Sequence, residues 1–538
     1  MAAEAETVAA ETGAPQWRRA IEVQRLARDG KAVVKLDGKQ IALFATADGI
    51  RACNNRCPHE GYPLREGTLE GCLLTCNWHN WKFDLGSGDN LYGGDRLRIY
   101  PTELRDGAVW VDVADPPAAS RQAAARANLS AAFADHEYDR MARELARLAK
   151  SGADPVEAVA AAIAWAHDRL EFGMTHAHAA AAGWLRLHDE ADDPARRLAA
   201  LNEAIGYLSW DTLREAAHPY PEGTAAWDKA GFLAAVEAQD ETRAVSLLRG
   251  ALAAGPDFAD LDETLSQAAL AHYADFGHSL IYVVHTAELI ERLGPAVAAP
   301  LLLPLVRSLV YASREDLIPE FRRYAAMRAA WPVAPGRAAC WSGSVVGRSV
   351  EAAMGAVVDA AATVAPTAIY DALLRDAATN LLHFDTAWQD KTDSSVAQNV
   401  GWLDFTHGLT FANAVRRQCT KFPALWPAGL LQIACFVGRN TGFTLAEPQL
   451  ASWRVGNRAA FEAEAIARIH DHGEDRYILS AHLLKTYLAA SEEADTAASP
   501  ETAEIVLAAI NRFLHAGLKR KHVLRTAHQA LEFVALED

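Results

Sequence analysis

The sequence predicts two units of different class: a small all-β sandwich over residues 16–115 and a large all-α region over residues 129–538. Short apolar runs separated by Asp-Gly pairs mark the first unit. From about residue 129 onward, apolar residues recur at three- and four-residue spacing, which is typical of helices. The length of 538 residues also favours more than one domain, because single cores rarely organise more than about 250 to 300 residues.

Charge and hydropathy exclude several classes of function. A net charge of −17 would repel nucleic acid and anionic membrane surfaces, so we expect neither as a partner. Residues 1–15 are acidic, lack the features of a signal peptide and are predicted to be a disordered tail. The most apolar run, residues 293–312, holds three prolines and an arginine, which argues against a membrane span. We therefore expect a cytoplasmic protein.

Turn residues divide the β unit into its strands. Asp-Gly pairs at residues 37–38 and 106–107 lie between apolar runs, which is a strong signal for a hairpin. We expect strands over residues 32–36, 41–44, 98–100 and 109–113. Pro116 and Pro117 then resist both helix and sheet, so residues 116–128 are predicted to be a linker.

Two short motifs inside the β unit combine cysteine with histidine. Cys57-Pro58-His59 is followed, after 16 intervening residues, by Cys76-Asn77-Trp78-His79. Each motif offers one thiolate and one imidazole, which matches a [2Fe–2S] centre whose two irons take different ligands. Tetrahedral zinc is the alternative, but zinc sites usually group like ligands together, whereas the two types alternate here.

These motifs and their flanking residues resemble the Rieske family over residues 16–115. Gly61, Leu64 and Gly67 follow the first motif, and Trp81-Lys82-Phe83 follows the second. The resemblance implies a [2Fe–2S] cluster, and it implies four ligands: Cys57, His59, Cys76 and His79. Tyr62 and Trp78 occupy the places where high-potential respiratory members carry a disulfide, so the resemblance is to the low-potential kind that delivers electrons.

Histidines also recur in the helical region. Of 19 histidines, 17 lie outside the cluster motifs, and several fall within apolar helix patterns. Four of these patterns begin with similar short stretches, at residues 171–178, 275–278, 404–407 and 478–482, and a second helix follows each. Equivalent helices packed together would direct such histidines to one interior point, which is how helical bundles build metal sites. The alternative is that each is an ordinary core histidine with a hydrogen-bond partner.

The helical region lacks the Asp-x₂-His-x₄-His run of the usual Rieske oxygenase catalytic domain. Over about residues 130–530 it instead resembles the questin oxidase-like family. The matching stretches are Phe172–His176, Phe276–His278, His407 with Thr410 and Ala414–Arg416, and His482–Lys485. That resemblance implies a non-haem iron held by several histidines and a carboxylated lysine. The implied ligands are His176, His278, His407, His482 and Lys485.

Several alternatives remain open at this site. His178 could replace His176, and Lys485 could be an ordinary charged lysine beside a core histidine. Carboxylate-x₂-His pairs could instead form a di-iron site; these pairs are Asp275 with His278, Asp404 with His407 and Glu215 with His218. We expect Asp275 and Asp404 to orient the histidine rings or to cap their helices.

These observations predict a Rieske-containing non-haem iron oxygenase, in which the cluster passes electrons to the helical iron and an organic substrate reacts with O₂. An aromatic or polyketide substrate is implied by the resemblance alone. A pocket lined by aromatic residues is expected from Trp184, Tyr282, Trp402 and Phe411. Since no nucleotide-binding glycine motif occurs, electrons should come from a separate NAD(P)H-dependent reductase or ferredoxin. The alternative is an electron-transfer protein whose helical domain is a docking scaffold for a partner.

Overall fold

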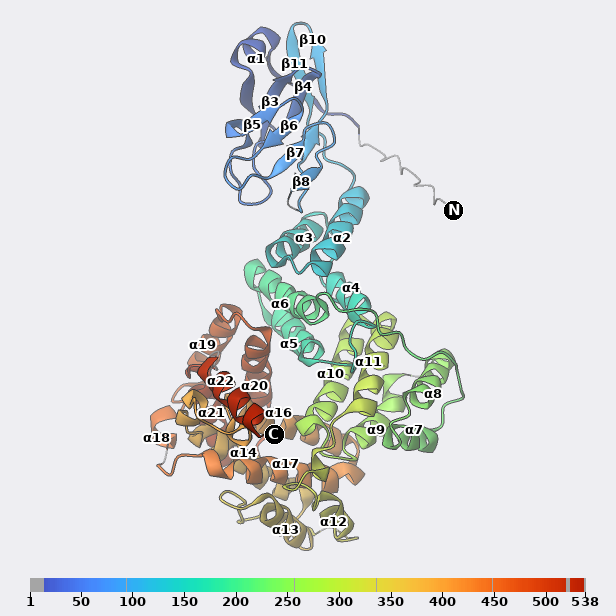
Figure 1. The fold of residues 1–538 in the computed structure, drawn as a ribbon, viewed down its shortest axis with the longest axis vertical. Helices are drawn as coiled ribbons and strands as arrows, with labels where there is room; N and C mark the ends of the chain where they lie inside the picture. Colours follow the sequence, from blue (N-terminus) through green and yellow to red (C-terminus); the bar gives the residue numbers. More distant parts are fainter. Residues whose placement is uncertain are drawn as a thin grey trace. The chain divides into compact units, whose positions relative to one another are not determined.

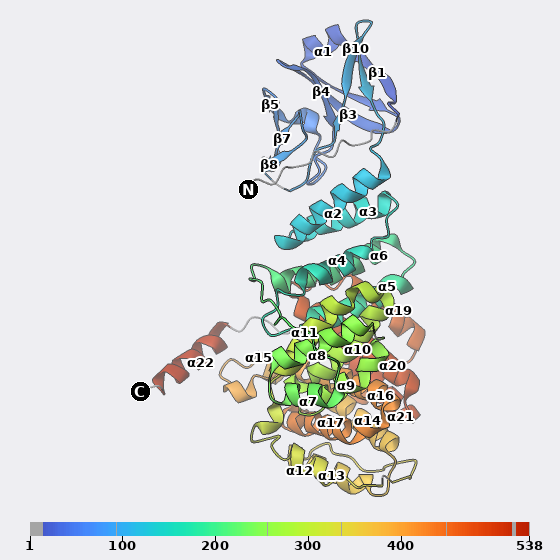
Figure 2. The ribbon, with the colours of Figure 1, turned by 90° about the vertical axis from the view of Figure 1, so that its right-hand side faces the viewer.

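The computed structural model describes residues 14–92, 94–255, 257–334, 336–447, 449–518 and 523–536 (Figure 1, Figure 2). The chain forms two compact units, Met1–Ala158 and Val159–Asp538. The tail predicted for residues 1–15 lies outside the described residues, apart from Ala14 and Pro15. Among the helices of the described residues, none combines the length and the apolar character that crossing a bilayer requires.

The first unit contains three antiparallel sheets with the orders β1-β11-β10, β2-β3-β4-β9 and β5-β6-β7-β8. The strands are β1 (Trp17–Glu22), β2 (Lys31–Leu36), β3 (Lys39–Thr46), β4 (Gly49–Asn54), β5 (Thr68–Glu70), β6 (Leu73–Thr75), β7 (Lys82–Asp84), β8 (Asn90–Tyr92), β9 (Ile99–Tyr100), β10 (Thr102–Arg105) and β11 (Ala108–Asp112). The predicted all-β class is confirmed for this unit. Asp37 and Gly38, with φ of 45° and 80°, form the predicted tight turn between β2 and β3.

Strand β3 is buried on both faces and separates two apolar cores. Ile41 and Leu43 face a core that includes residues of β4 and β11. Ala42 and Phe44 alternate with them and face a second core, which contains Cys57 and Cys76. Because successive residues of a strand point to opposite faces, one apolar strand supports both cores. Packing in the same core as Ala42 and Phe44 of β3 therefore fixes the positions of the two cysteines.

Three helices accompany these sheets: α1 (Val23–Asp29), α2 (Ala118–Ala134) and α3 (Tyr138–Lys150). Helix α2 differs from the prediction of a linker over residues 116–128. Pro117 is the residue before the helix, a place where proline is tolerated, and the alanine-rich segment after it has high helix propensity. Arg143 and Arg147 of α3 bind the fully buried carboxylate of Asp95 at 2.6 and 2.7 Å. This pair of contacts joins α3 to the loop before β9.

Apart from a few isolated β-bridges, the described secondary structure of the second unit is helical, as predicted. Helix α4 (Glu157–Ala166) begins at the boundary, and the helices that follow up to residue 329 are α5 (His176–Glu190), α6 (Pro194–Thr212), α7 (Lys229–Glu237), α8 (Glu241–Ala254), α9 (Phe258–Ala269), α10 (His278–Leu293), α11 (Ala298–Tyr311) and α12 (Tyr324–Ala329). Those beyond residue 349 are α13 (Val350–Ala361), α14 (Pro366–His383), α15 (Ala387–Asp390), α16 (Trp402–Lys421), α17 (Trp426–Asn440), α18 (Leu450–Trp453), α19 (Arg458–His470), α20 (Tyr477–Thr496), α21 (Pro500–Leu514) and α22 (Val523–Ala535).

Helices α5, α10, α16 and α20 form the centre of this unit. Each packs against two of the others, in the cyclic order α5, α10, α16, α20 (Figure 1). Each is also followed in the chain by a helix that packs against it, namely α6, α11, α17 and α21. These four helix pairs coincide with the four repeating stretches of the sequence. The chain thus returns to the centre four times, and each return adds one helix to the ring.

A buried carboxylate joins two helices of this ring to α14. Glu493 of α20 is fully buried and accepts hydrogen bonds from Arg416 at 2.8 Å and Asn413 at 2.8 Å, both on α16. Tyr370 of α14 donates a further bond at 2.7 Å. Because these donors lose a shared acceptor when Glu493 is removed, the carboxylate is a large local contributor to stability.

We expect Glu493→Ala to lower the free energy of unfolding by about 3–5 kcal/mol, because it leaves a cation and two polar groups without their buried partner. Glu504→Ala is the matched control, since Glu504 pairs with the exposed Arg454 at 2.5 Å. An exposed pair of that kind contributes about 0–1 kcal/mol. Urea unfolding followed by helix circular dichroism measures both changes. Equal effects for the two variants would contradict the role assigned to Glu493.

Candidate metal centres

Two loops with the same backbone pattern carry the cysteine–histidine motifs of the first unit. In loops 57–62 and 76–81 the cysteine N–H donates to the carbonyl five residues later, at 2.9 and 2.7 Å. In both loops the fourth residue after the cysteine donates back to the cysteine carbonyl at 2.9 Å. That residue is Gly61 in one loop and Asn80 in the other, with φ of 76° and 61°. Glycine and asparagine tolerate this left-handed conformation best, so the sequence supports both turns.

The cysteines of these loops lie inside the unit and the histidines lie toward its surface. Cys57 and Cys76 are 3% and 2% exposed, and burial raises the pKa of the Cys57 thiol to about 12. The rings of His59 and His79 are 4.7 Å apart, and His59 stacks on Trp81 at 4.4 Å. Two buried thiols facing two paired imidazoles fit a [2Fe–2S] cluster with sulfur ligands on the inner iron and nitrogen ligands on the outer iron.

A second group of histidines converges at the centre of the helical unit. The Nε2 atoms of His176 and His278 are 3.0 Å apart, and those of His407 and His482 are 3.3 Å apart. Ligand atoms of His176, His407 and His482 all lie within 4.8 Å of one another. The Nζ atom of Lys485 is 3.4 Å from Nε2 of His407. The structure therefore brings together all five residues predicted for this site.

The other ring nitrogen of three of these histidines is held by the backbone. Nδ1 of His407 donates to the carbonyl of Leu403 at 2.6 Å, and Nδ1 of His482 donates to the carbonyl of Ile478 at 2.6 Å. Nδ1 of His278 likewise donates to a carbonyl, that of Asp275. Since a carbonyl can only accept, the proton stays on Nδ1 and the lone pair of Nε2 faces the centre.

These imidazoles are neutral. Burial, with the positive charge of Lys485 as the second cause, lowers the pKa of His278 to about 3 and those of His176, His407 and His482 well below their usual range. The facing lone pairs of His407 and His482, whose Nε2 atoms are 3.3 Å apart, repel one another unless a cation lies between them. The donor set and its orientation thus fit a metal ion that prefers imidazole nitrogen, such as iron.

Lys485 is 5% exposed, and the described residues give it no acidic partner. Burial lowers the pKa of its amine to about 7, so a large fraction is neutral near neutral pH. A neutral, buried amine beside the histidines is the form that could react with carbon dioxide. The alternative of an ordinary solvated lysine does not match its burial.

A strained turn positions His278. Asp275, Phe276 and Gly277 all have positive φ, of 47°, 49° and 82°, which is costly for the two residues that have a side chain. The turn aims the carbonyl of Asp275 at the His278 ring, while the Asp275 carboxylate accepts from the Ser313 N–H at 2.7 Å. Asp275 therefore orients the ring, as predicted, but through its main chain. The predicted second carboxylate, that of Asp404, binds the N–H of Gly401 at 2.8 Å inside its own helix end.

His178 and the carboxylate-x₂-His pairs do not join this group. His178 is 1% exposed, and neither of its ring nitrogens has a hydrogen-bond partner among the described residues. Burial lowers its pKa to about 4. Within the described residues, no carboxylate belongs to the histidine group, which argues against the di-iron alternative. The third pair, Glu215 with His218, lies outside the group as well.

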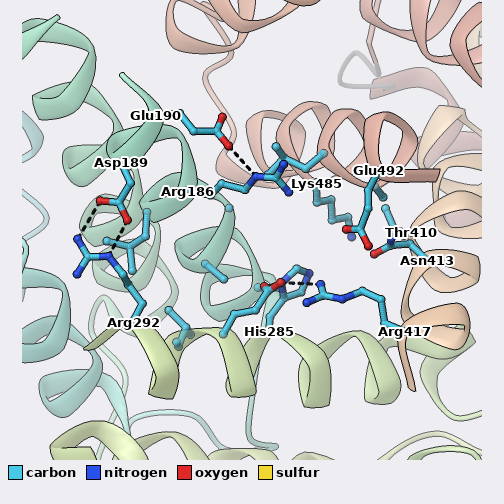
Figure 3. Close-up of a pocket in the computed structure, with 18 residues that line it drawn as sticks. Arg186, Asp189, Glu190, His285, Arg292, Thr410, Asn413, Arg417, Lys485 and Glu492 are labelled. Atoms are coloured by element: carbon cyan, nitrogen blue, oxygen red, sulfur yellow. Dashed lines mark hydrogen bonds and ion pairs between the residues drawn. The ribbon is translucent and has the colours of Figure 1, made fainter. Parts of the chain in front are cut away.

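A cavity of about 330 Å³ extends from Lys485 along the four central helices (Figure 3). Lining residues follow the histidine by three positions on α5, α16 and α20, by seven on α5, α10 and α20, and by ten on all four helices. The residues ten positions after each histidine are charged and alternate in sign around the ring: Arg186, Glu288, Arg417 and Glu492. The helices therefore lead away from the histidines in one direction, with the charged ring about 15 Å beyond them.

The cavity walls differ from the aromatic lining predicted from the sequence. Its apolar residues are small or aliphatic, such as Ala182, Gly183 and Leu289. Trp184, Trp402 and Phe411 are fully buried in the packing between helices, and Tyr282 is also buried. Large aromatic side chains fill helical cores, whereas a cavity requires small ones. A second, smaller cavity of about 140 Å³ reaches His278 and His407 and is lined by Phe276, Phe436 and Arg439 among others.

Comparisons with known proteins concern the first unit. A family model described as Rieske [2Fe-2S] domain matches residues 16–97. A 4beta-methylsterol monooxygenase from Methylococcus capsulatus is 38% identical over 95 residues, which are 15% of this chain and 26% of that protein. The chain thus spans about a quarter of that relative's length.

Ferredoxins also match this unit. The ferredoxin component of a naphthalene 1,2-dioxygenase/salicylate 5-hydroxylase system from Ralstonia sp is 38% identical over 80 residues, which are 14% of this chain and 77% of that protein. A solved ferredoxin of carbazole 1,9a-dioxygenase from Nocardioides aromaticivorans IC177 has 20% identity and a TM-score of 0.17, covering 18% of this chain and 97% of the ferredoxin. Through its N-terminal unit, the chain belongs to the Rieske [2Fe-2S] domain family.

Proposed function

We propose that this protein is an oxygenase with two iron centres: a Rieske cluster that delivers electrons and a non-haem iron in the helical unit. Cys57, His59, Cys76 and His79 would hold the cluster. His176, His278, His407, His482 and Lys485 would hold the second iron, with Lys485 as its carbamate. The substrate is an organic molecule that reacts with O₂, and an aromatic or polyketide compound fits the family resemblance of the helical unit.

The observation that carries this proposal is the convergence of four neutral imidazoles beneath a cavity of substrate size. Their Nε2 atoms lie 3.0 to 3.3 Å apart in pairs, and the backbone fixes the tautomer of three of the four rings. Lys485 belongs both to this group and to the cavity wall, so a molecule in the cavity would lie directly against the centre. Core histidines with ordinary hydrogen bonds would not leave their acceptor nitrogens facing one another.

Each proposed centre supplies a chemical function that the other lacks. A Rieske cluster, when bound, supplies single electrons but has no open coordination position for substrate. An iron held by the histidines would supply the site for dioxygen activation. The chain's own residues bind and orient: the cysteine–histidine loops fix the cluster, and the four helices shape the cavity and exclude water from the centre. A separate reductase or ferredoxin is proposed as the electron source, in line with the multicomponent system named for the Ralstonia ferredoxin.

An electron carrier is the second candidate. Its support is the match to the Ralstonia ferredoxin, of which the chain covers 77%. In that case the helical unit would dock a partner enzyme and hold no metal. The number of irons per chain separates the two candidates, because a carrier holds about two and the proposed oxygenase about three.

His278→Ala should lower the iron content from about three to about two per chain and leave the cluster intact. The reason is that His278 supplies one of the converging lone pairs, whereas the cluster ligands lie in the first unit. Iron analysis, together with the electron paramagnetic resonance spectrum of the reduced protein, measures both quantities. His515→Ala is the control, since His515 pairs with Glu464 at 3.1 Å on the exposed surface. Iron content that is equal in wild type and His278→Ala would refute the helical site.

Lys485→Glu should retain the helical iron, and Lys485→Met should lose it, if the lysine binds as a carbamate. Glutamate also presents a carboxylate, whereas methionine fills a similar volume without an oxygen ligand. Wild-type protein equilibrated with ¹³C-labelled bicarbonate should show one carbamate signal by nuclear magnetic resonance, absent from both variants. Full iron content in Lys485→Met would show that the lysine is not a ligand.

Cys76→Ser should abolish repeated turnover but leave the helical iron in place, because the thiolate is required only by the cluster. The measurement is reductant-dependent O₂ consumption in the presence of a reductase, with iron analysis on the same sample. A variant that consumes O₂ as fast as wild type would make the helical unit independent of the Rieske domain.

A further inference from the structure

We infer that His285, held by Glu288 and Arg417, is the acid–base residue of the large cavity and accepts the proton of a hydroxyl group on the substrate. The oxygenation that would follow rests on the proposed function, whereas binding and ionisation of the hydroxyl group do not. It narrows the substrate to a neutral organic molecule with an acidic hydroxyl, that is, a phenol or an enol.

His285 lies on the same face of α10 as the proposed iron ligand His278. The two are seven residues apart, which places His285 two turns, or about 10 Å, beyond the centre. His285 lines the cavity and keeps 21% of its side chain exposed (Figure 3). Gly183 of α5 and Ala489 of α20, each seven residues after the histidine of its helix, also line the cavity. A molecule that reaches from the centre to His285 spans both sites.

Hydrogen bonds fix the proton on the far side of the ring. Nδ1 of His285 donates to Oε2 of Glu288 at 2.6 Å, and Oε1 of Glu288 accepts from Arg417 at 2.5 Å. Burial opposes the charge of Glu288, but His285 and Arg417 outweigh it and lower its pKa to about 2. Glu288 is therefore a carboxylate that can only accept, so Nδ1 of His285 carries the proton of this bond and Nε2 is the ring nitrogen left for a substrate. Among the described residues Nε2 has no hydrogen-bond partner.

Apart from Lys485, the other charged residues that line the cavity are paired. Arg292 binds Asp189 through two hydrogen bonds of 2.6 and 2.8 Å. Arg186 binds Glu190 at 2.9 Å. Glu492 of α20 pairs with Arg416, and Lys485 lies at the inner end beside the histidines. Since the arginines already have carboxylate partners, the cavity offers little to an anionic substrate, and a neutral hydroxyl suits the open Nε2 better.

The proposed step is a proton transfer without any change of oxidation state. The O–H bond of the substrate breaks, its electron pair stays on the oxygen, and a new N–H bond forms at Nε2 of His285. The imidazolium is stabilised by Glu288, as an ionised carboxylate on Nδ1 stabilises such a charge elsewhere. The resulting oxyanion is more electron-rich than the hydroxyl, which makes its ring or double bond easier to oxidise.

The test uses 4-nitrophenol, which is yellow only when ionised, and 4-nitroanisole, which has the same ring without the hydroxyl. Bound to the full-length protein at a pH where the free phenol is mostly neutral, 4-nitrophenol should shift toward its phenolate by about tenfold or more. His285→Ala should abolish this shift, and Glu288→Gln should reduce it, while both variants keep wild-type iron content and circular dichroism. His515→Ala should behave as wild type, and 4-nitroanisole should show no spectral change.

Repeating the measurement in His278→Ala separates this inference from the proposed function. A shift that persists there and disappears in His285→Ala supports the inference, whatever the iron count proves to be. A shift that survives in His285→Ala would assign ionisation to the metal or to another group and overturn it. The inference is also wrong if wild-type protein does not bind 4-nitrophenol, or binds it without a shift toward the phenolate. This holds even if the protein contains about three irons per chain.

Discussion

The helical unit depends on a single constraint: the Nε2 atoms of four buried imidazoles must converge on one point. This arrangement is unfavourable in itself, because the lone pairs repel and burial removes water that could bridge them. Other parts of the fold hold the rings in place against this unfavourable free energy. A strained turn holds His278, carbonyls hold His407 and His482, and the four helices close into a ring around them. A cation between the rings would remove this repulsion, which is the physical basis of the proposed iron site.

Parts of the fold and site that depend on local sequence were predictable. The cysteine–histidine loops carry their ligands within a few residues, and each loop's turn is encoded by Gly61 or Asn80. The hairpin at Asp37-Gly38 is likewise a local signal, and so is the change to helical spacing of apolar residues near residue 129. The convergence of His176 with His278, His407 and His482 was predictable because similar stretches recur, and equivalent helices tend to occupy equivalent places.

Other features depend on packing and could not be read from the sequence. The Pro116-Pro117 pair suggested a linker, yet proline is compatible with the start of α2. Trp184 and Trp402 suggested a substrate pocket, but they fill the core, while alanine and glycine form the cavity. The alternating ring of Arg186, Glu288, Arg417 and Glu492 becomes visible only when the four helices are aligned at their histidines. Each of these residues alone is an ordinary charged position on a helix.

The common direction of the four central helices has an electrostatic consequence. Helices α5 and α10 begin at His176 and His278, so the positive ends of two helix dipoles meet at the histidine group. Neutral imidazoles do nothing to offset this field, and it opposes a lone cation while favouring an anion. A metal ion and a negatively charged ligand should therefore enter the site cooperatively. Under the proposed function, uptake of carbon dioxide by Lys485 and metal binding would be linked equilibria, in which each raises the affinity for the other.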